Sequence, residues 1–279
     1  MRFDFHKYKN YKECPRMYLW KAERRPLITP KNHYFTVPGE FIQKFFEMYC
    51  NSWKKQGVVF TKEKIKNRMR PYWEHLILKN SIDWSHPASR KGEADLFLEC
   101  VDSIYNNLKT LDVYDNTRSE VKFEVTLQSG DVLVGKVDFI HNTDKGVIIS
   151  DGKNSGTIGK NVDNRQLMFY ALLHKFIYKE LPAGLKFIYY KHAVEEPLLF
   201  TTRDIDELWG DFIQTMVAIK NAKEFLPTPC AKACRNCDYL EQCPEGTADM
   251  ASRKKGPRTV KIEGLGSKSK ETGVYTINL

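Results

Sequence analysis

Apolar residues recur every three or four positions along several segments of the chain, a pattern that predicts helices with one buried face. The clearest of these helices are expected over residues 39–55, 62–82, 92–111 and 204–225. In the middle of the chain apolar and polar residues instead alternate, which is typical of strands. Strands are expected over residues 119–127, 185–191 and 197–201 and in a hairpin around 134–153. Together these patterns predict an α/β fold.

The hairpin in the middle of the chain carries the candidate chemistry. Two alternating apolar runs flank a polar connection at residues 141–145. Every second side chain of a strand shares a face, so Asp151 and Lys153 emerge side by side, and Asp138 lies opposite them if the hairpin pairs in register. Two converging carboxylates repel each other unless a cation lies between them. Mg²⁺ binds one or two carboxylates in such sites and keeps several waters.

Length and composition limit the possible classes of protein. A chain of 279 residues with 42% apolar composition can bury one sizeable core. It contains no run of about 18 apolar residues, the length needed to span a membrane. The first ten residues lack the apolar segment of a secretory signal, so we expect a cytoplasmic protein of a bacterial, archaeal or phage-infected host cell. No G-x-x-x-x-G-K-[ST] sequence occurs, so an ATP motor is not expected.

Positive charge gathers at the two ends of the chain. The net charge is +9, and residues 1–31 hold nine Lys or Arg against three acids. Residues 248–279 hold seven against three, in a Gly-, Ser- and Lys-rich stretch that predicts a flexible basic tail. Such charge suits a phosphate backbone, although solvated ends that aid solubility would look the same.

Four of the seven cysteines are clustered near the C-terminus, in the spacing Cys230-x3-Cys234-x2-Cys237-x5-Cys243. In a cytoplasmic chain such a cluster indicates a metal site rather than disulfides. Four local thiolates could hold zinc, and three of them together with Cys14 could hold an iron–sulfur cluster. Taken alone, Cys14 is interpreted as a buried thiol.

The central segment resembles the RecB-like branch of the PD-(D/E)XK nuclease superfamily. In that branch Gly-x-x-Asp lies on one strand, Asp/Glu-x-Lys on the next, and Gln-x-x-x-Tyr on the following helix. The matching pairs here are Gly135 with Asp138, Asp151 with Lys153, and Gln166 with Tyr170. The resemblance implies a restriction-endonuclease-like core, a central mixed sheet flanked by helices. An N-terminal helical region and a C-terminal cysteine-rich metal staple would complete the fold.

The resemblance also implies a role for each motif residue. Asp138 and Asp151 would bind Mg²⁺ or Mn²⁺, which activates water and stabilises charge on the scissile phosphate. Lys153 would orient the attacking water and stabilise the transition state. Gln166 and Tyr170 lie one helical turn apart and would position the DNA strand or the lysine.

A glutamate in the strand before the hairpin also faces the metals in this family. Glu120 and Glu124 are both candidates, and their even separation puts them on one face of a strand. Glu120 is preferred because of its distance from Gly135. Cross-strand pairing with Lys136 is the ordinary explanation for either glutamate.

Two positions depart from the family pattern. A helix of the family reads Gly-x-x-x-His, with the histidine near the metals, whereas Gly39 is followed here by Gln43, a poor metal ligand. We interpret Gln43 as a polar residue on an exposed helix face. Gly152 stands where the family carries an apolar or aromatic residue, and a glycine permits close approach of another group to the backbone.

Relatives with a Cys-Pro near the N-terminus and Cys-x2-Cys-x5-Cys near the C-terminus contain a [4Fe–4S] cluster. The resemblance therefore implies iron–sulfur ligation by Cys14, Cys234, Cys237 and Cys243, with Cys230 left as a spare thiol. Zinc held by the four local cysteines is the alternative. The cluster would join the two ends of the chain.

The resemblance implies a single nuclease domain over residues 1–247, followed by the tail at 248–279. Within it, a helical insertion covers 39–111 and the catalytic core 118–201. Single-chain relatives, including CRISPR-associated RecB-like nucleases, imply a DNA exonuclease that degrades single strands from the 5′ end in DNA repair or recombination. The alternatives are a non-cleaving DNA-binding subunit of a helicase–nuclease or spacer-acquisition complex, and a zinc-stapled binding protein.

Overall fold

The computed structural model describes residues 1–28, 34–80, 82–85, 89–111, 116–159 and 162–253. The chain divides into two compact units. One consists of Met1–Lys9 and Pro30–Ala222, and the other of Asn10–Thr29 and Lys223–Leu279. Among the described residues, no helix is both long enough and apolar enough to cross a membrane.

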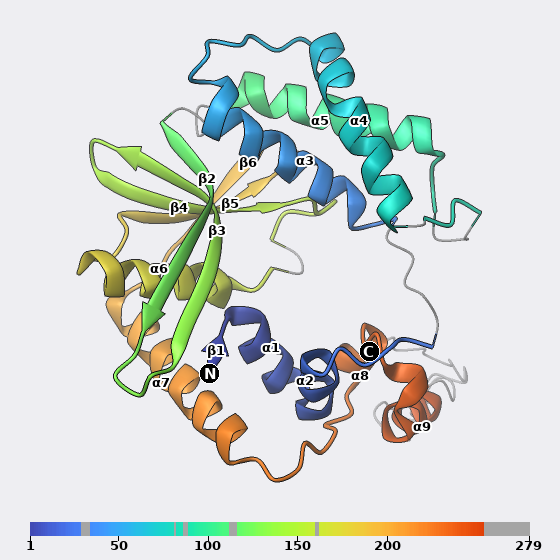
Figure 1. The fold of residues 1–279 in the computed structure, drawn as a ribbon, viewed down its shortest axis with the longest axis vertical. Helices are drawn as coiled ribbons and strands as arrows, with labels where there is room; N and C mark the ends of the chain where they lie inside the picture. Colours follow the sequence, from blue (N-terminus) through green and yellow to red (C-terminus); the bar gives the residue numbers. More distant parts are fainter. Residues whose placement is uncertain (29–33, 81, 86–88, 112–115, 160–161, 254–279) are drawn as a thin grey trace, which may run out of the picture. The chain divides into compact units, whose positions relative to one another are not determined.

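The first unit is built on a six-stranded mixed sheet (Figure 1). Its strands are β1 (Arg2–Phe3), β2 (Thr117–Thr126), β3 (Val132–Thr143), β4 (Gly146–Lys153), β5 (Gly184–Tyr189) and β6 (Val194–Leu198). The sheet runs in the order β1-β3-β4-β5-β6, and β2 also pairs with β3. The pairs β1–β3 and β4–β5 are parallel and the others antiparallel. The polar turn of the hairpin is shorter than predicted, because β3 continues to Thr143 and β4 starts at Gly146.

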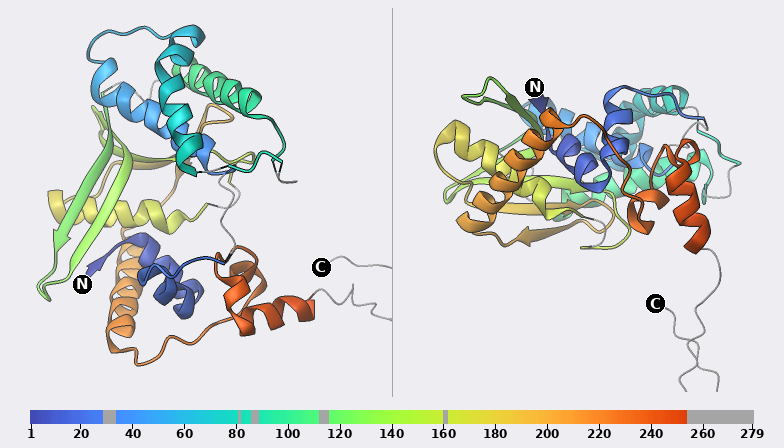
Figure 2. Two further views of the ribbon diagram at one scale, coloured as in Figure 1. Left: turned by 45° about the vertical axis from the view of Figure 1, so that its right-hand side comes forward. Right: turned by 90° about the horizontal axis from the view of Figure 1, so that it is seen from below.

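Helices cover both faces of this sheet, as Figures 1 and 2 show for the first unit. The helices on one side are α3 (Val37–Met48), its π-helical continuation η1 (Tyr49–Trp53), α4 (Lys62–Asn80) and α5 (Glu93–Thr110). Their apolar faces form one core with Phe139, Ile188 and Tyr190 of the β3 and β5 region. The helices on the other side are α6 (Asn164–Tyr178) and α7 (Thr202–Asn221). This arrangement confirms the predicted α/β fold with a central mixed sheet flanked by helices.

The helix boundaries follow from the residues at their ends. Helix α3 begins at Val37, two residues before the predicted start, because Pro38 is well suited to the first turn of a helix. Helix α7 begins with a capping box: the Thr201 side chain accepts a hydrogen bond from the Asp204 backbone N–H, and the Asp204 carboxylate accepts one from the Thr201 backbone N–H. The side chain of Asp163 accepts the amide of Arg165 and so caps α6, the helix that carries two of the motif residues.

The second unit joins two segments that are far apart in the sequence. Its elements are the last residues of α1 (Phe5–Glu13), α2 (Pro15–Ala22), α8 (Ala231–Arg235), the 3₁₀ turn η3 (Leu240–Gln242) and α9 (Pro244–Arg253). Trp20 packs edge-on against Tyr239, with ring centroids 5.7 Å apart. The side chain of Gln242 donates to the Pro26 carbonyl and accepts from Arg25. Helix α9 extends into the expected tail, and the remainder of that tail, 254–279, lies outside the described residues.

Candidate active site

The hairpin strands separate where the candidate carboxylates lie. Phe139 lies opposite Ser150, and in this register the next pair would be Asp138 and Asp151. The pairing of β3 with β4 ends at that point, whereas β4 continues beside β5 as far as Lys153. The two aspartates thus lie where the sheet opens, at the end of two paired strands.

The two carboxyl groups lie close to each other, Asp151 buried and Asp138 partly buried. Burial raises the pKa of Asp138 well above its ordinary value, and the negative charge of Asp151 adds to this. The Gly152 amide, which donates to Asp138 Oδ2 at 2.9 Å, acts in the opposite direction. Asp151 is only 2% exposed, and burial raises its pKa, although Lys153 opposes this shift. Two acids placed in this way would be stabilised in their charged form by a cation.

Lys153 connects these carboxylates to helix α6. Its Nζ lies 2.5 Å from Asp151 Oδ2 and donates to Gln166 Oε1 at 3.2 Å. Gln166 Nε2 in turn donates to Tyr170 Oη at 3.1 Å, as expected for residues four positions apart on a helix. Burial raises the pKa of Tyr170, and the charge of Asp151 adds to the shift. The structure therefore brings all five predicted residues of the hairpin and helix together.

Helix α6 can approach the sheet because residue 135 is a glycine. A Cβ atom at Gly135 would lie 2.6 Å from Leu173 Cδ1 and 3.3 Å from the Tyr170 ring. A side chain at this position would force the Leu173 side chain to move and would crowd the Tyr170 ring. The glycine of the first motif therefore leaves room for two side chains of α6, one of them a motif residue.

Glu120 reaches the site through an unusual backbone conformation. Its φ is +59°, in the left-handed region, and the pairing of β2 with β3 omits this residue. Its carboxylate accepts from Gln43 Nε2 at 2.8 Å, forms an ion pair with Lys136, and adds to the raised pKa of Asp138. Glu124 instead lies in an exposed ion pair with Arg2. The two glutamates thus end in different surroundings, and only Glu120 lies beside the aspartates.

The interpretation of Gln43 as an exposed polar residue is wrong. Gln43 is partly buried, and its amide lies between Glu120 and the Tyr190 hydroxyl. Sequence reasoning also missed Tyr190, which follows β5. A Cβ atom at Gly152 would lie 1.9 Å from Tyr190 Oη. The unexpected glycine at position 152 is therefore the sequence feature that indicates the close approach of another side chain, the Tyr190 phenol, to the β4 backbone.

Replacing Gly152 by alanine is expected to destabilise the protein by about 3 kcal/mol, at the upper end of the usual cost of overpacking. The added methyl group would displace the Tyr190 phenol, which is fixed in the core. Denaturant unfolding of the variant would measure the loss. Gly156→Ala is the control, since a Cβ atom at Gly156 meets nothing within 4 Å. Equal stabilities of the two variants would contradict this account.

The donor set at the open end of the hairpin fits a hard divalent cation. Within the described part of the chain, no three His, Cys, Asp or Glu side chains are grouped so that they could hold a metal ion by themselves. Mg²⁺ does not require such a cage, because it keeps several waters and often takes one or two carboxylates. Asp138 and Asp151 supply that number of carboxylates, on neighbouring strands where the hairpin pairing ends.

The second unit contains a cavity lined by cysteines from both of its segments. Cys14, Cys234, Cys237 and Cys243 all line it, whereas Cys230 is exposed. Burial raises the pKa of the Cys234 and Cys237 thiols; the neighbouring Cys230 and Cys243 add to the shift of Cys234, and Cys14 adds to that of Cys237. Four cysteine side chains lining one cavity are donors of the kind that iron and zinc bind. Within the described residues, however, no three of them are grouped closely enough to form a metal site as they stand.

A family model describes most of the chain. Residues 3–244 match the model of the PD-(D/E)XK nuclease superfamily. A solved structure described as the crystal structure of SSO0001 aligns with a TM-score of 0.33 and 15% identity, covering 74% of this chain and 96% of that one. A search of curated proteins found no match. Because the family match covers well over half of its length, the chain belongs to the PD-(D/E)XK nuclease superfamily.

Proposed function

We propose that this protein is a DNA nuclease that hydrolyses phosphodiesters with Mg²⁺ or Mn²⁺. The observation that carries the proposal is the convergence of Asp138, Asp151 and Lys153 at the open end of the hairpin, in a chain that belongs to a nuclease superfamily. A protein that only binds DNA would not need two acids and a lysine at one point. Holding two carboxylates together, one of them buried, has a cost that a bound cation would offset.

The proposed mechanism assigns a step to each side chain. Asp138 and Asp151 would hold the divalent metal, which lowers the pKa of bound water and neutralises charge on the phosphate. Lys153, already paired with Asp151, would orient the attacking water and stabilise the negative charge that develops on the phosphate oxygens. Gln166 would fix the Lys153 ammonium through its carbonyl oxygen, and Tyr170 would fix Gln166.

We further propose that Cys14, Cys234, Cys237 and Cys243 hold a [4Fe–4S] cluster with a structural role. The set of cysteines around the cavity supports iron–sulfur over a zinc site of local cysteines, because it includes Cys14 and leaves Cys230 exposed. Arg16 also lines the cavity and would partly balance the negative charge of a thiolate-bound cluster.

The substrate that the resemblance favours is single-stranded DNA degraded from the 5′ end. Degradation of end-labelled single-stranded DNA by anaerobically purified protein tests this. We expect loss of label that depends on Mg²⁺ or Mn²⁺, stops with EDTA, and begins at the 5′-labelled end. Release from the 3′ end would overturn the polarity, and cleavage of circular single strands would show endonuclease activity. If folded, iron-loaded protein leaves all substrates intact, a non-cleaving role in a larger complex would replace the proposal.

A further inference from the structure

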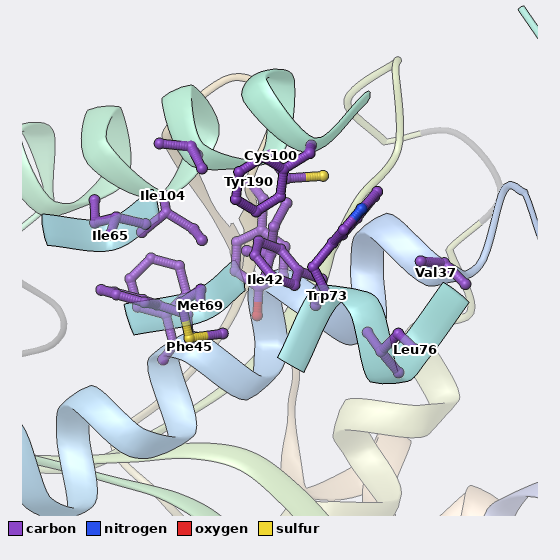
Figure 3. Close-up of a cluster of buried hydrophobic side chains, with 14 of the residues drawn as sticks. Val37, Ile42, Phe45, Ile65, Met69, Trp73, Leu76, Cys100, Ile104 and Tyr190 are labelled. Carbon is purple, nitrogen blue, oxygen red and sulfur yellow. The ribbon is translucent and has the colours of Figure 1, made fainter. Parts of the chain in front are cut away.

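Tyr190 is fixed at both its backbone and its ring. Its carbonyl accepts from Ser103 Oγ at 2.8 Å and from Asn107 Nδ2 at 2.6 Å, both of them buried side chains of α5. Its ring stacks on Phe46, with ring centroids 5.6 Å apart. Figure 3 shows Tyr190 within the helical core cluster, together with Ile42 and other residues of α3 to α5. The contacts with α3 and α5 therefore fix the position of the Tyr190 phenol next to β4.

From this phenol a chain of hydrogen bonds leads to Glu120. The Tyr190 hydroxyl crosses Gly152 and donates to Gln43 Oε1, and Gln43 Nε2 donates to Glu120 Oε1 at 2.8 Å. A carboxylate only accepts hydrogen bonds, so Gln43 must present its NH₂ group to Glu120 and its carbonyl to the phenol. Glu120 thus sets the orientation of the Gln43 amide, and the Tyr190 hydroxyl holds that orientation by donating to the Gln43 carbonyl.

Glu120 needs such support for two reasons. A left-handed backbone is costly for a residue other than glycine and persists only where the surroundings enforce it. Glu120 also lies between the paired residues Ser119–Phe139 and Val121–Val137, which puts it next to Asp138 on the neighbouring strand, where the two negative charges repel each other. Lys136, whose side chain is 57% exposed, pairs with the same carboxylate from the solvent side. Gln43 holds it from the protein side.

We propose that Gln43 and Tyr190 are positioning residues that hold the Glu120 carboxylate beside Asp138, next to the two aspartates that would ligate the metal. This inference rests on the proposed function, since it concerns the same site. Neither residue touches the reacting atoms. We call the chain of hydrogen bonds from Tyr190 through Gln43 to Glu120 the relay. The relay orients Glu120 before a metal ion binds, which lowers the free-energy cost of bringing a third negative charge to the site.

Mn²⁺ binding, measured by electron paramagnetic resonance on the full chain without DNA, tests the relay. Tyr190→Phe keeps the ring and removes the hydroxyl, and we expect the Mn²⁺ affinity to fall about 10-fold, as for other residues that orient metal ligands. Gln43→Met should give a similar loss. Tyr189→Phe is the matched control, because the Tyr189 hydroxyl donates to Glu196 instead. Its affinity should equal that of the parent protein.

Combining variants separates this role from a structural one. If Tyr190 acts through Glu120, the double variant Tyr190→Phe/Glu120→Gln should bind Mn²⁺ no more weakly than Glu120→Gln alone. Additive losses, or unchanged affinity in Tyr190→Phe, would overturn the relay. If the parent protein binds Mn²⁺ and Asp138→Ala does not, a failure in Tyr190→Phe concerns the relay alone. A parent protein without Mn²⁺ binding would overturn both the relay and the proposed function.

Discussion

Lys153→Ala is expected to reduce phosphodiester cleavage by at least about 10³-fold while leaving the affinity for DNA close to that of the parent protein. In the proposed mechanism, the lysine orients the attacking water and stabilises the charge that develops on the phosphate. Its ammonium lies 2.5 Å from Asp151 and is oriented by Gln166. Removing it would withdraw stabilisation that is realised in the transition state, so binding would change little. Single-turnover cleavage and fluorescence anisotropy with the same oligonucleotide would measure the two effects.

Lys186→Ala is the matched control for this variant. Lys186 lies on the neighbouring strand β5 and also forms an ion pair, with Glu195 at 2.9 Å. Lys186→Ala also removes one positive charge, but Lys186 pairs with Glu195 and not with Asp138 or Asp151. Cleavage should therefore stay within about 2-fold of the parent rate, as for most surface changes. Asp138→Ala and Asp151→Ala should match the loss in Lys153→Ala. Cleavage that survives in all three would refute the proposed mechanism.

The hairpin and its charged residues could be predicted because their geometry is local. Alternation of apolar residues sets which strand positions share a face, and the chain between the strands is too short to allow many registers. Asp138 and Asp151 therefore lie directly beyond the last pair of the hairpin, Phe139 and Ser150, and Lys153 follows Asp151 on the same strand. Helical periodicity placed Gln166 with Tyr170 for the same reason.

The surroundings of Glu120 could not be predicted from local patterns. Strand alternation assumes an extended backbone, and the positive φ of Glu120 breaks that assumption. Local patterns predict an exposed Gln43, because its partner Tyr190 lies 147 positions away in the sequence. Contacts made through tertiary packing produce no periodic pattern in the sequence. Gly152 is a different kind of sequence signal, because the Tyr190 phenol occupies the space that a side chain at position 152 would need.

The cysteines show the same limit. Spacing alone could group Cys230 with Cys234, Cys237 and Cys243 as easily as it could replace Cys230 by Cys14. The structure places Cys14 at the start of α2, where it lines the cavity with the last three, because α2 packs on the C-terminal segment of the same unit. The two possible ligand sets therefore predict opposite results for two single variants.

Cys14→Ala is expected to lose the iron and the brown colour of anaerobically purified protein. A cluster ligated by Cys14 and by residues near the C-terminus cross-links distant parts of the chain, so its loss should destabilise the fold by about 2–4 kcal/mol, the range typical of covalent cross-links. Iron analysis, visible absorption and thermal unfolding would record these effects.

Cys230→Ala should keep both the iron and the stability, because Cys230 is exposed. A zinc site of local cysteines would reverse the pattern, with metal lost in Cys230→Ala and retained in Cys14→Ala. Full iron in Cys14→Ala would therefore remove Cys14 from the ligand set, whatever metal the remaining cysteines hold.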